Sequence, residues 1–253
     1  MNFSEISIID THSHFSSGTP SDPQRSESHK DSEEFLNRMR IAANIEKTFM
    51  STFASVMDPA YVVSENEYLR KLCLERDYMY QWVVVDPRID ESISQAREIL
   101  KTDKCVGIKL HPVYHKYSVL EYEEKIFPLA AEFQTRVLIH PEGKAGYILP
   151  VADKYPDVTI IMAHLSGKND DHIDAIRRSK HRNIYTDIAT IGSASNNAVE
   201  NAVEQIGSDR ILFGTDTYAA GYLRGRVEYS AISDGDKLNI LLNNALRLFS
   251  DKL

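Results

Sequence analysis

IIDTHSHF, at residues 8–15, is an apolar run that predicts a β-strand and places two histidines, His12 and His14, near its end. Alternate residues of a strand point to the same face, so the two imidazoles can approach one ion together. Alone, the pair is equally compatible with two histidines that cap the end of a strand. The interpretation therefore depends on the partners that the rest of the chain supplies.

Seven further short runs of apolar or β-branched residues follow along the chain. Most are hydrophobic throughout rather than alternating, which is typical of strands buried on both faces. With the first run, the predicted strands cover residues 6–14, 45–53, 80–87, 105–112, 136–143, 158–167, 183–190 and 211–217. A segment with helical spacing of apolar residues follows each one, at residues 32–45, 61–77, 91–101, 121–133, 146–156, 172–180, 196–207 and 236–249.

This alternation predicts an α/β protein, a single (β/α)8 TIM barrel that occupies residues 1–253 as one domain. The main alternative is an open doubly wound sheet, but no glycine-rich dinucleotide motif follows the first strand. Two predicted helices contain a proline, Pro128 or Pro150, which weakens a helix unless it lies in the first turn. The stretches at 16–30, 112–120 and 217–235 are the candidates for loops over the mouth of the barrel.

Composition and charge limit the classes of protein that fit. The chain has 29 Lys+Arg against 37 Asp+Glu, and this formal charge of −8 argues against a nucleic-acid partner. No apolar run approaches the roughly 20 residues of a membrane helix, and the first residues lack the features of a signal peptide. We therefore expect a cytoplasmic protein without a membrane partner, in which Cys73 and Cys105 are reduced and buried.

Polar residues recur at the predicted strand ends, where the catalytic groups of such barrels gather. A lone histidine at the end of an apolar strand is more often structural than functional. Recurrence at the same end of strands one, five, six and eight is harder to attribute to packing, because buried ionisable groups cost free energy unless they are paired or metal-bound. Neutral imidazoles suit Zn²⁺ and similar ions. The residues at these ends are His12, His14, Lys109, His111, His140, His164, Asp187 and Asp216.

The segments DTHSH, GIKLHP, VLIHPEG, IIMAHLSG, ILFGTD and NNALRLF resemble the amidohydrolase superfamily, especially its amidohydrolase-2 branch of TIM-barrel metal-dependent hydrolases and decarboxylases. The ordered set covers essentially the whole chain. The resemblance implies that the metal ligands are His12, His14, His140 and Asp216. It implies that Asp216 also accepts a proton from the water that the metal activates. His164 would contact the substrate or a developing anion beside one metal, or ligate a second metal.

Lys109 bears on the number of metal ions. In binuclear proteins that resemble this pattern, a lysine after strand four is carboxylated and bridges two metals. The alternatives are an ammonium group that binds an anionic part of the substrate, which we favour, and a lysine paired with Asp216 or another acid. We therefore expect one divalent ion, with Zn²⁺ favoured, and two ions if Lys109 is carboxylated. His111 lies on the same strand face and is an expected substrate contact, or a residue that orients a ligand.

Several further residues are weaker candidates. Three residues after strand four are expected to line the pocket: Tyr114, His115 and Tyr117. Arg224 and Arg226 follow strand eight and would hold a substrate carboxylate. Asp187 is a candidate to support a ligand histidine, and Asp86, before a proline, is expected to fix a turn. Three histidines in polar segments are expected at the surface: His29, His172 and His181.

Three functions fit these residues. The favoured one is metal-dependent hydrolysis of a C–N or C–O bond in a small anionic amide, lactone or ester, with Asp216 as general base toward the metal-activated water. His164 and Lys109 would then stabilise the oxyanion. The alternative is metal-dependent non-oxidative decarboxylation of an unsaturated or aromatic carboxylic acid, which uses the same ligands. A second alternative is a non-catalytic barrel that binds a metal or an anion. The partner is a small molecule in each case, and a homo-oligomer stays open.

Overall fold

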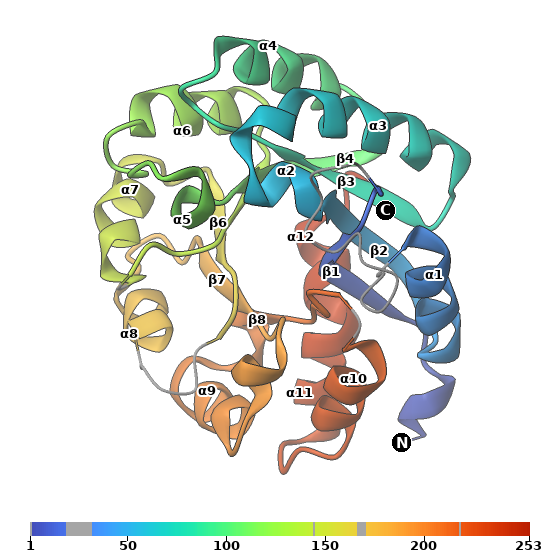
Figure 1. Cartoon of the computed structure of the whole chain (residues 1–253). Helices are drawn as coiled ribbons and strands as arrows, with labels where there is room; N and C mark the ends of the chain where they lie inside the picture. Colours follow the sequence, from blue (N-terminus) through green and yellow to red (C-terminus); the bar gives the residue numbers. More distant parts are fainter. Residues whose placement is uncertain (1, 19–31, 144, 166–170, 218) are drawn as a thin grey trace.

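The computed structural model describes residues 2–18, 32–143, 145–165, 171–217 and 219–253 (Figure 1). Most of the predicted polar loop at 16–30 lies outside these residues. Among the described helices, none is long and apolar enough to cross a membrane.

Eight parallel strands form one sheet in which the spatial order follows the chain order. Each strand lies within or close to its predicted run, and most are shorter. The strands are β1 (Ile8–Phe15), β2 (Ile45–Thr52), β3 (Met79–Val84), β4 (Cys105–Leu110), β5 (Arg136–Ile139), β6 (Thr159–Met162), β7 (Ile184–Asp187) and β8 (Ile211–Leu212).

The sheet closes on itself where β8 returns to β1. The amide of Thr11 donates to the carbonyl of Phe213 at 2.9 Å, and the amide of His14 donates to the carbonyl of Asp216 at 2.7 Å. Ser13 and Asp216 form a parallel bridge. The predicted (β/α)8 TIM barrel is therefore confirmed, and its seam runs through the histidine motif itself.

Helices form an outer layer around the strands (Figure 1). All eight predicted helices are present, although the last is divided by a π-helical turn (Asn239–Asn243). Pro150 lies in a first turn, whereas Pro128 lies inside its helix. The helices are α1 (Glu33–Ala42), α2 (Phe53–Met57), α3 (Val62–Glu75), α4 (Asp90–Ile99), α5 (Pro112–His115), α6 (Glu123–Glu132), α7 (Ile148–Lys154), α8 (Asp171–Arg178), α9 (Ala198–Ile206), α10 (Ala220–Glu228), α11 (Asp234–Leu238) and α12 (Asn244–Leu248).

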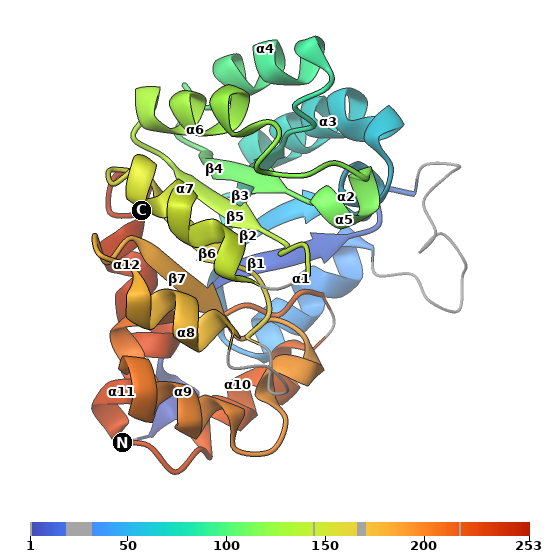
Figure 2. The same cartoon turned by 90° about the vertical axis from the view of Figure 1, so that its left-hand side faces the viewer.

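Three helices were not expected from the sequence: α2, α5 and α10. The last two lie in the stretches that were candidates for loops over the mouth. Figure 2 shows α2 and α5 at the end of the barrel to which the strand arrows point, while both termini lie on the opposite side. The two short helices therefore stand beside the mouth.

The interior below the mouth is apolar. One buried cluster joins side chains from all eight strands with Phe249, which packs edge-on against Phe49 and Trp82. In the later strands these residues precede the polar ones, as Leu138 precedes His140. The polar groups therefore lie directly above a layer of apolar side chains. Cys73 and Cys105 are buried and unpaired, as expected.

Candidate active site

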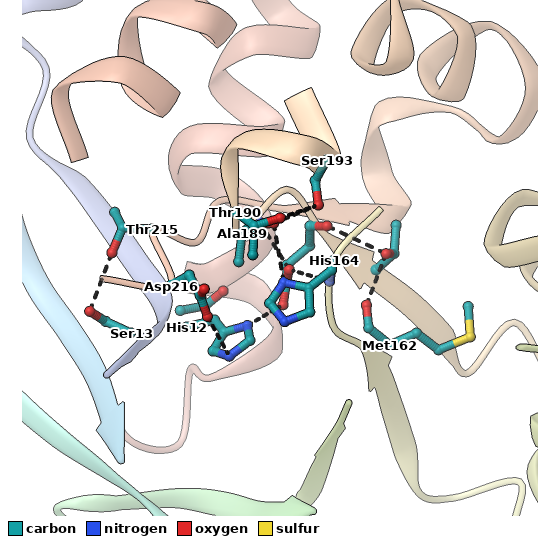
Figure 3. Close-up of polar contacts among 12 residues, drawn as sticks. His12, Ser13, Met162, His164, Ala189, Thr190, Ser193, Thr215 and Asp216 are labelled. Atoms are coloured by element: carbon teal, nitrogen blue, oxygen red, sulfur yellow. Dashed lines mark hydrogen bonds and ion pairs between the residues drawn. The ribbon is translucent and has the colours of Figure 1, made fainter. Parts of the chain in front are cut away.

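Three donor atoms converge at the mouth. The Nε2 atoms of His12 and His14 lie 3.1 Å apart, and Oδ1 of Asp216 lies 3.8 Å from the first and 3.7 Å from the second. Figure 3 shows Asp216 and His164 turned toward His12. Both have positive φ angles, 63° for Asp216 and 68° for His164. Such uncommon backbone conformations cluster at functional sites.

Hydrogen bonds to the other ring nitrogens orient the two histidines. Nδ1 of His12 lies 2.9 Å from a carboxylate oxygen of Asp187, which only accepts, so this nitrogen carries the proton. Nδ1 of His14 lies 3.3 Å from the carbonyl oxygen of Ser51, which accepts, and 2.8 Å from its hydroxyl group, which can donate or accept. Burial lowers the pKa of both imidazoles, which are therefore neutral at pH 7.

With Nδ1 protonated in both rings, the two Nε2 atoms face each other with their lone pairs. Such an arrangement is repulsive unless a cation lies beside the nitrogens; the ammonium group of Lys109 contacts only Nε2 of His12, at 2.9 Å, whereas a metal ion would bind both nitrogens. With the carboxylate of Asp216 beside them, the donor set is two neutral imidazoles and one oxygen, which divalent transition metals bind. The residues present thus fit a divalent metal ion.

Asp187 supports this arrangement without facing the cavity. One carboxylate oxygen accepts from His12, and the other accepts from the amides of His164 at 2.9 Å and Ala189 at 3.0 Å. The expected contact of Asp187 with a candidate ligand histidine is therefore present, while the metal-binding role of His12 stays a prediction. His12, His164 and Asp187 also form a second group of closely spaced ligand atoms. Since His12 and Asp187 already bond each other, this group is a hydrogen-bond network.

Lys109 lies at the centre of the cluster and has no exposed surface. Its Nζ is 2.9 Å from Nε2 of His12, and burial lowers its pKa to about 8. The ammonium group donates to the lone pair that a metal would use. Of the alternatives left open by the sequence, the ion pair with Asp216 is present only as a longer-range interaction: the direct contact of Lys109 is with His12, while the charges of Asp187 and Asp216 raise its pKa against the effect of burial.

A row of rings forms one side of the mouth. Tyr114 stacks on His111 with ring centroids 4.4 Å apart, and His111 stacks on His140 at 4.2 Å. His140 then meets His164 edge-on at 4.9 Å, and burial lowers the pKa of His140 to about 3. In the described chain, His140 belongs to neither group of closely spaced ligand atoms. Its role as a metal ligand stays a prediction.

A cavity of about 350 Å³ opens over these groups. Its walls combine the polar cluster with an apolar surface that α2 contributes. The sequence analysis did not identify this surface; its only signal was a position directly after strand two. The lining residues are His14, Phe53, Val56, Met57, His111, Tyr114, His140, His164, Thr190 and Asp216.

Arg224 does not lie at the mouth, and the prediction that it holds a substrate carboxylate is wrong. Its side chain is buried, and its guanidinium group donates to backbone carbonyls that precede β1 and β2, among them Ile6 at 3.1 Å and Asn44 at 3.2 Å. These carbonyls lie at the amino ends of the strands, opposite the site. The position after strand eight was right, but Arg224 lies in α10 rather than in a loop, and this helix turns the side chain away; Arg226 of the same helix donates to Glu200.

The three histidines expected at the surface have different outcomes. His181 is exposed, and His29 lies outside the described residues. His172 is buried, with Nδ1 3.1 Å from the hydroxyl of Thr186, so the expectation for it is wrong. The reason is that α8 is strongly amphipathic and His172 falls on its inner face.

Comparison with known proteins gives one family and several similar structures. The sequence model of the family described as Amidohydrolase matches residues 9–250. A search of curated proteins gives no match. A 2,6-dihydroxybenzoate decarboxylase from Rhizobium superposes with a TM-score of 0.75 at 16% sequence identity, covering 96% of this chain and 98% of that chain.

Two other similar structures widen the range of activities. A dihydroxybenzoic acid decarboxylase from Polaromonas, with bound manganese and the inhibitor 2-nitroresorcinol, has a TM-score of 0.72 at 16% identity and covers 96% of this chain and 97% of that chain. A proposed 2-pyrone-4,6-dicarboxylic acid hydrolase from Pseudomonas putida has a TM-score of 0.72 at 15% identity, with 98% of both chains covered. At these identities the likeness shows the fold.

Proposed function

Because this chain belongs to the amidohydrolase family, we propose that it is a metal-dependent hydrolase that opens a C–N or C–O bond in a small anionic amide, lactone or ester. The observation that carries this proposal is the carboxylate of Asp216, which lies within 3.8 Å of both imidazole donors and lines the cavity. Burial raises the pKa of this carboxyl, whereas a bound cation would lower it and favour the carboxylate form, which can accept a proton.

The ion would be held by His12, His14 and Asp216, with His140 as the predicted fourth ligand. When bound, a divalent metal supplies a Lewis acid that polarises a carbonyl group and makes water more acidic. Zn²⁺ suits the imidazole donors, whereas the similar Polaromonas decarboxylase contains manganese. Both metals therefore belong in the tests below.

Three side chains would carry out the proton transfer, the charge stabilisation and the substrate binding. Asp216 would take the proton of the attacking water and return it to the leaving group. Lys109 carries N–H donors and a positive charge, so it would stabilise negative charge on the carbonyl oxygen. His164 has its Nδ1 proton directed at the carbonyl of Ala189 at 3.2 Å. Its Nε2 is therefore an acceptor, and it would bind a hydroxyl or amide proton of the substrate.

We favour one metal ion because of the position of Lys109. Its ammonium group contacts His12 directly and has no described acidic partner within ion-pair distance. An ion on Nε2 of His12 would displace the N–H group of Lys109 from that nitrogen, and an uncarboxylated Lys109 offers no oxygen that could bridge to a second divalent ion. A carboxylated Lys109 would supply such a bridge, so metal stoichiometry tests the assignment. The expected result is one ion per chain by elemental analysis.

Decarboxylation is the second candidate, and the apolar wall favours it. Among the described residues of the cavity lining, none is an arginine or lysine, and Phe53, Val56 and Met57 form one side. A substrate with one carboxylate at the metal-binding residues His14 and Asp216 and an unsaturated or aromatic body would fit these surfaces. Two of the similar structures are decarboxylases of such acids.

The deciding experiment measures the fate of the substrate. Protein loaded with Zn²⁺ or Mn²⁺ is profiled against lactones, esters, amides and unsaturated or aromatic acids in water enriched in ¹⁸O. Hydrolysis places the heavy oxygen in the product, whereas decarboxylation releases CO₂ without this label in the remaining carbon skeleton. A protein that purifies without a divalent ion, and gains neither stability nor activity from one, contradicts both candidates.

A further inference from the structure

Behind the wall that α2 and α5 form lies a polar cluster that the proposed chemistry does not use, in which two members are buried and the side chain of the third, Arg88, is 35% exposed. Its members are Asp86, which follows β3, Arg88, and His115 at the end of α5. Asp86 and His115 are 0% and 1% exposed. None of the three side chains lines the cavity over the metal-binding residues, so the expectation that His115 lines it is wrong, and Tyr117 is not among the lining residues either. The cluster therefore acts on the site, if at all, through the two helices.

Arg88 connects the end of β3 to the end of α5. Its guanidinium group lies 2.6 Å from Asp86 Oδ2 and donates to the carbonyl oxygen of His115 at 2.5 Å. A second N–H group points at the carbonyl of Lys116 at 3.4 Å. Lys116 has a left-handed backbone conformation and ends the helix. The free carbonyls at this helix end are thus held by a cation that Asp86 fixes in place.

His115 connects α5 to α2. Its Nε2–H donates to the carbonyl oxygen of Ser55 at 2.9 Å. Its Nδ1 has no hydrogen-bond partner among the described residues and lies 3.6 Å from Asp86 Oδ2. Burial lowers the pKa of His115, so the ring is neutral and Nε2 carries its one proton. A single directional bond therefore joins the two helices through this side chain.

Helices this short are not stable by themselves, since isolated helices below about 12 residues are marginal in water. α2 and α5 have 5 and 4 residues. Their positions must come from tertiary contacts, and apolar contacts alone would tolerate sliding. Burying the carboxylate of Asp86 and an imidazole with one unbonded nitrogen costs free energy, but the hydrogen bonds of the cluster restrict the orientation of the two helices as well as their distance. The helices so held carry Phe53 and Tyr114 on the cavity wall.

We propose that Asp86, Arg88 and His115 are positioning residues that set the spacing of α2 and α5, and thereby select the part of the substrate remote from the reacting bond. The selectivity part rests on the proposed function, whereas the coupling of the two helices does not. Loss of the contacts made by these three residues should make both helices more mobile and weaken substrate binding. It should leave the metal ligands in place and the rate of the chemical step unchanged.

The test uses the metal-loaded full chain and four variants. His115→Leu removes the bond to Ser55, and His115→Gln keeps an amide N–H at the same number of bonds from Cβ. Arg88→Met releases the end of α5. Arg97→Met is the control, because it breaks the exposed pair with Glu132 on the outer helices. Hydrogen exchange is measured by mass spectrometry for residues 53–57 and 112–117.

In His115→Leu, amide exchange should rise at least about tenfold in both segments, and His115→Gln should restore most of the protection. Arg88→Met should act first on 112–117, and Arg97→Met on neither segment. On whichever substrate the profiling identifies, KM should rise about tenfold with kcat little changed. Two results would overturn the proposal. One is unchanged amide exchange at residues 53–57 in His115→Leu; the other is exchange in His115→Gln that is as fast as in His115→Leu. This exchange readout needs no substrate, so it stands apart from the proposed reaction.

Discussion

The contacts of both ring nitrogens fix the orientation of the His12 side chain at the mouth of the barrel. Its Nδ1 is occupied by Asp187, so its Nε2 is left to face His14 and Lys109. Asp187 in turn binds the amide of His164. Orientation, protonation state and neighbour position are therefore set by the same carboxylate. This degree of pre-organisation is what a metal ligand requires, since a rotated imidazole loses its ion.

At the residue scale, Asp216→Asn is the sharpest test of the proposed chemistry. Asparagine tolerates the positive φ of 63° at this position as well as aspartate does, so the fold and the β8–β1 bridge should remain. The amide cannot take a proton from water, and kcat should fall by about 10²- to 10⁴-fold. Turnover is compared with circular dichroism and melting temperature. Wild-type turnover in a folded variant would falsify the role of Asp216.

The histidine pair and Asp216 could be predicted because strand ends are visible in sequence and side chains alternate along a strand. Arg224 shows where this reasoning stops. Its position after strand eight was correct, but its direction depends on how α10 packs against the start of the chain. Nothing local distinguishes an arginine that faces a ligand from one that binds carbonyls. Long flexible side chains are therefore the least predictable members of a site.

At the element scale, Arg224 ties α10 to the segments that precede β1 and β2. Arg224→Met leaves several buried carbonyls and the carboxylate of Glu228, 2.6 Å away, without their cation. The free energy of unfolding should fall by about 2–4 kcal/mol, measured by urea denaturation, with kcat of the folded enzyme unchanged. Arg70→Met, in an exposed pair with Glu67, is the control and should cost less than about 1 kcal/mol. A loss of turnover in folded Arg224→Met would show instead that Arg224 contributes to the active site.

A second element contact, between α9 and α10, should respond to pH. Glu200 on α9 accepts from Arg226 on α10 and from the amide of Ala231. The hydrogen bond with Arg226 lowers the pKa of Glu200 from 4.5 to about 2. Because the folded pKa is the lower one, the stabilisation is complete above pH 4.5 and disappears as the pH falls toward 2.

Glu200→Gln should therefore destabilise the protein by about 1 kcal/mol at pH 7, and the difference from wild type should shrink at pH 3.5. Urea denaturation at several pH values measures it. Glu98→Gln, in an exposed pair with Lys101, is the matched control. A difference that stays constant or grows in acid would mean that the ion pair with Arg226 is not its source.

The short helices α2 and α5 explain why the elements were only partly predicted. Periodicity needs about two turns before it can be recognised, and segments of 4 or 5 residues offer less than that. Both helices instead depend on tertiary contacts such as His115 with Ser55. The strands and long helices were predictable because their hydrophobic pattern repeats. The cavity wall was not, because its elements form only in the folded barrel.

At the scale of the whole molecule, residues of the candidate site also close the barrel. β8 has only 2 residues, so the return to β1 rests on bonds such as the amide of Asp216 to the carbonyl of His12 at 2.8 Å. A ligand that joins β1 to Asp216 also fastens this seam. Metal binding should therefore stabilise the entire fold, because a seam that opens in unfolding loses the ion as well.

Removing the metal with a chelator should lower the melting temperature of the full chain. An ion at about 100 times its Kd contributes roughly 2.7 kcal/mol, which for a chain of this length corresponds to about 5–10 °C. Zn²⁺ or Mn²⁺ added back should restore the temperature. His14→Ala removes one donor from the seam, so its melting temperature should respond little to chelator or metal. If His14→Ala responds as strongly as wild type, the stabilising ion binds elsewhere and the seam is not its site.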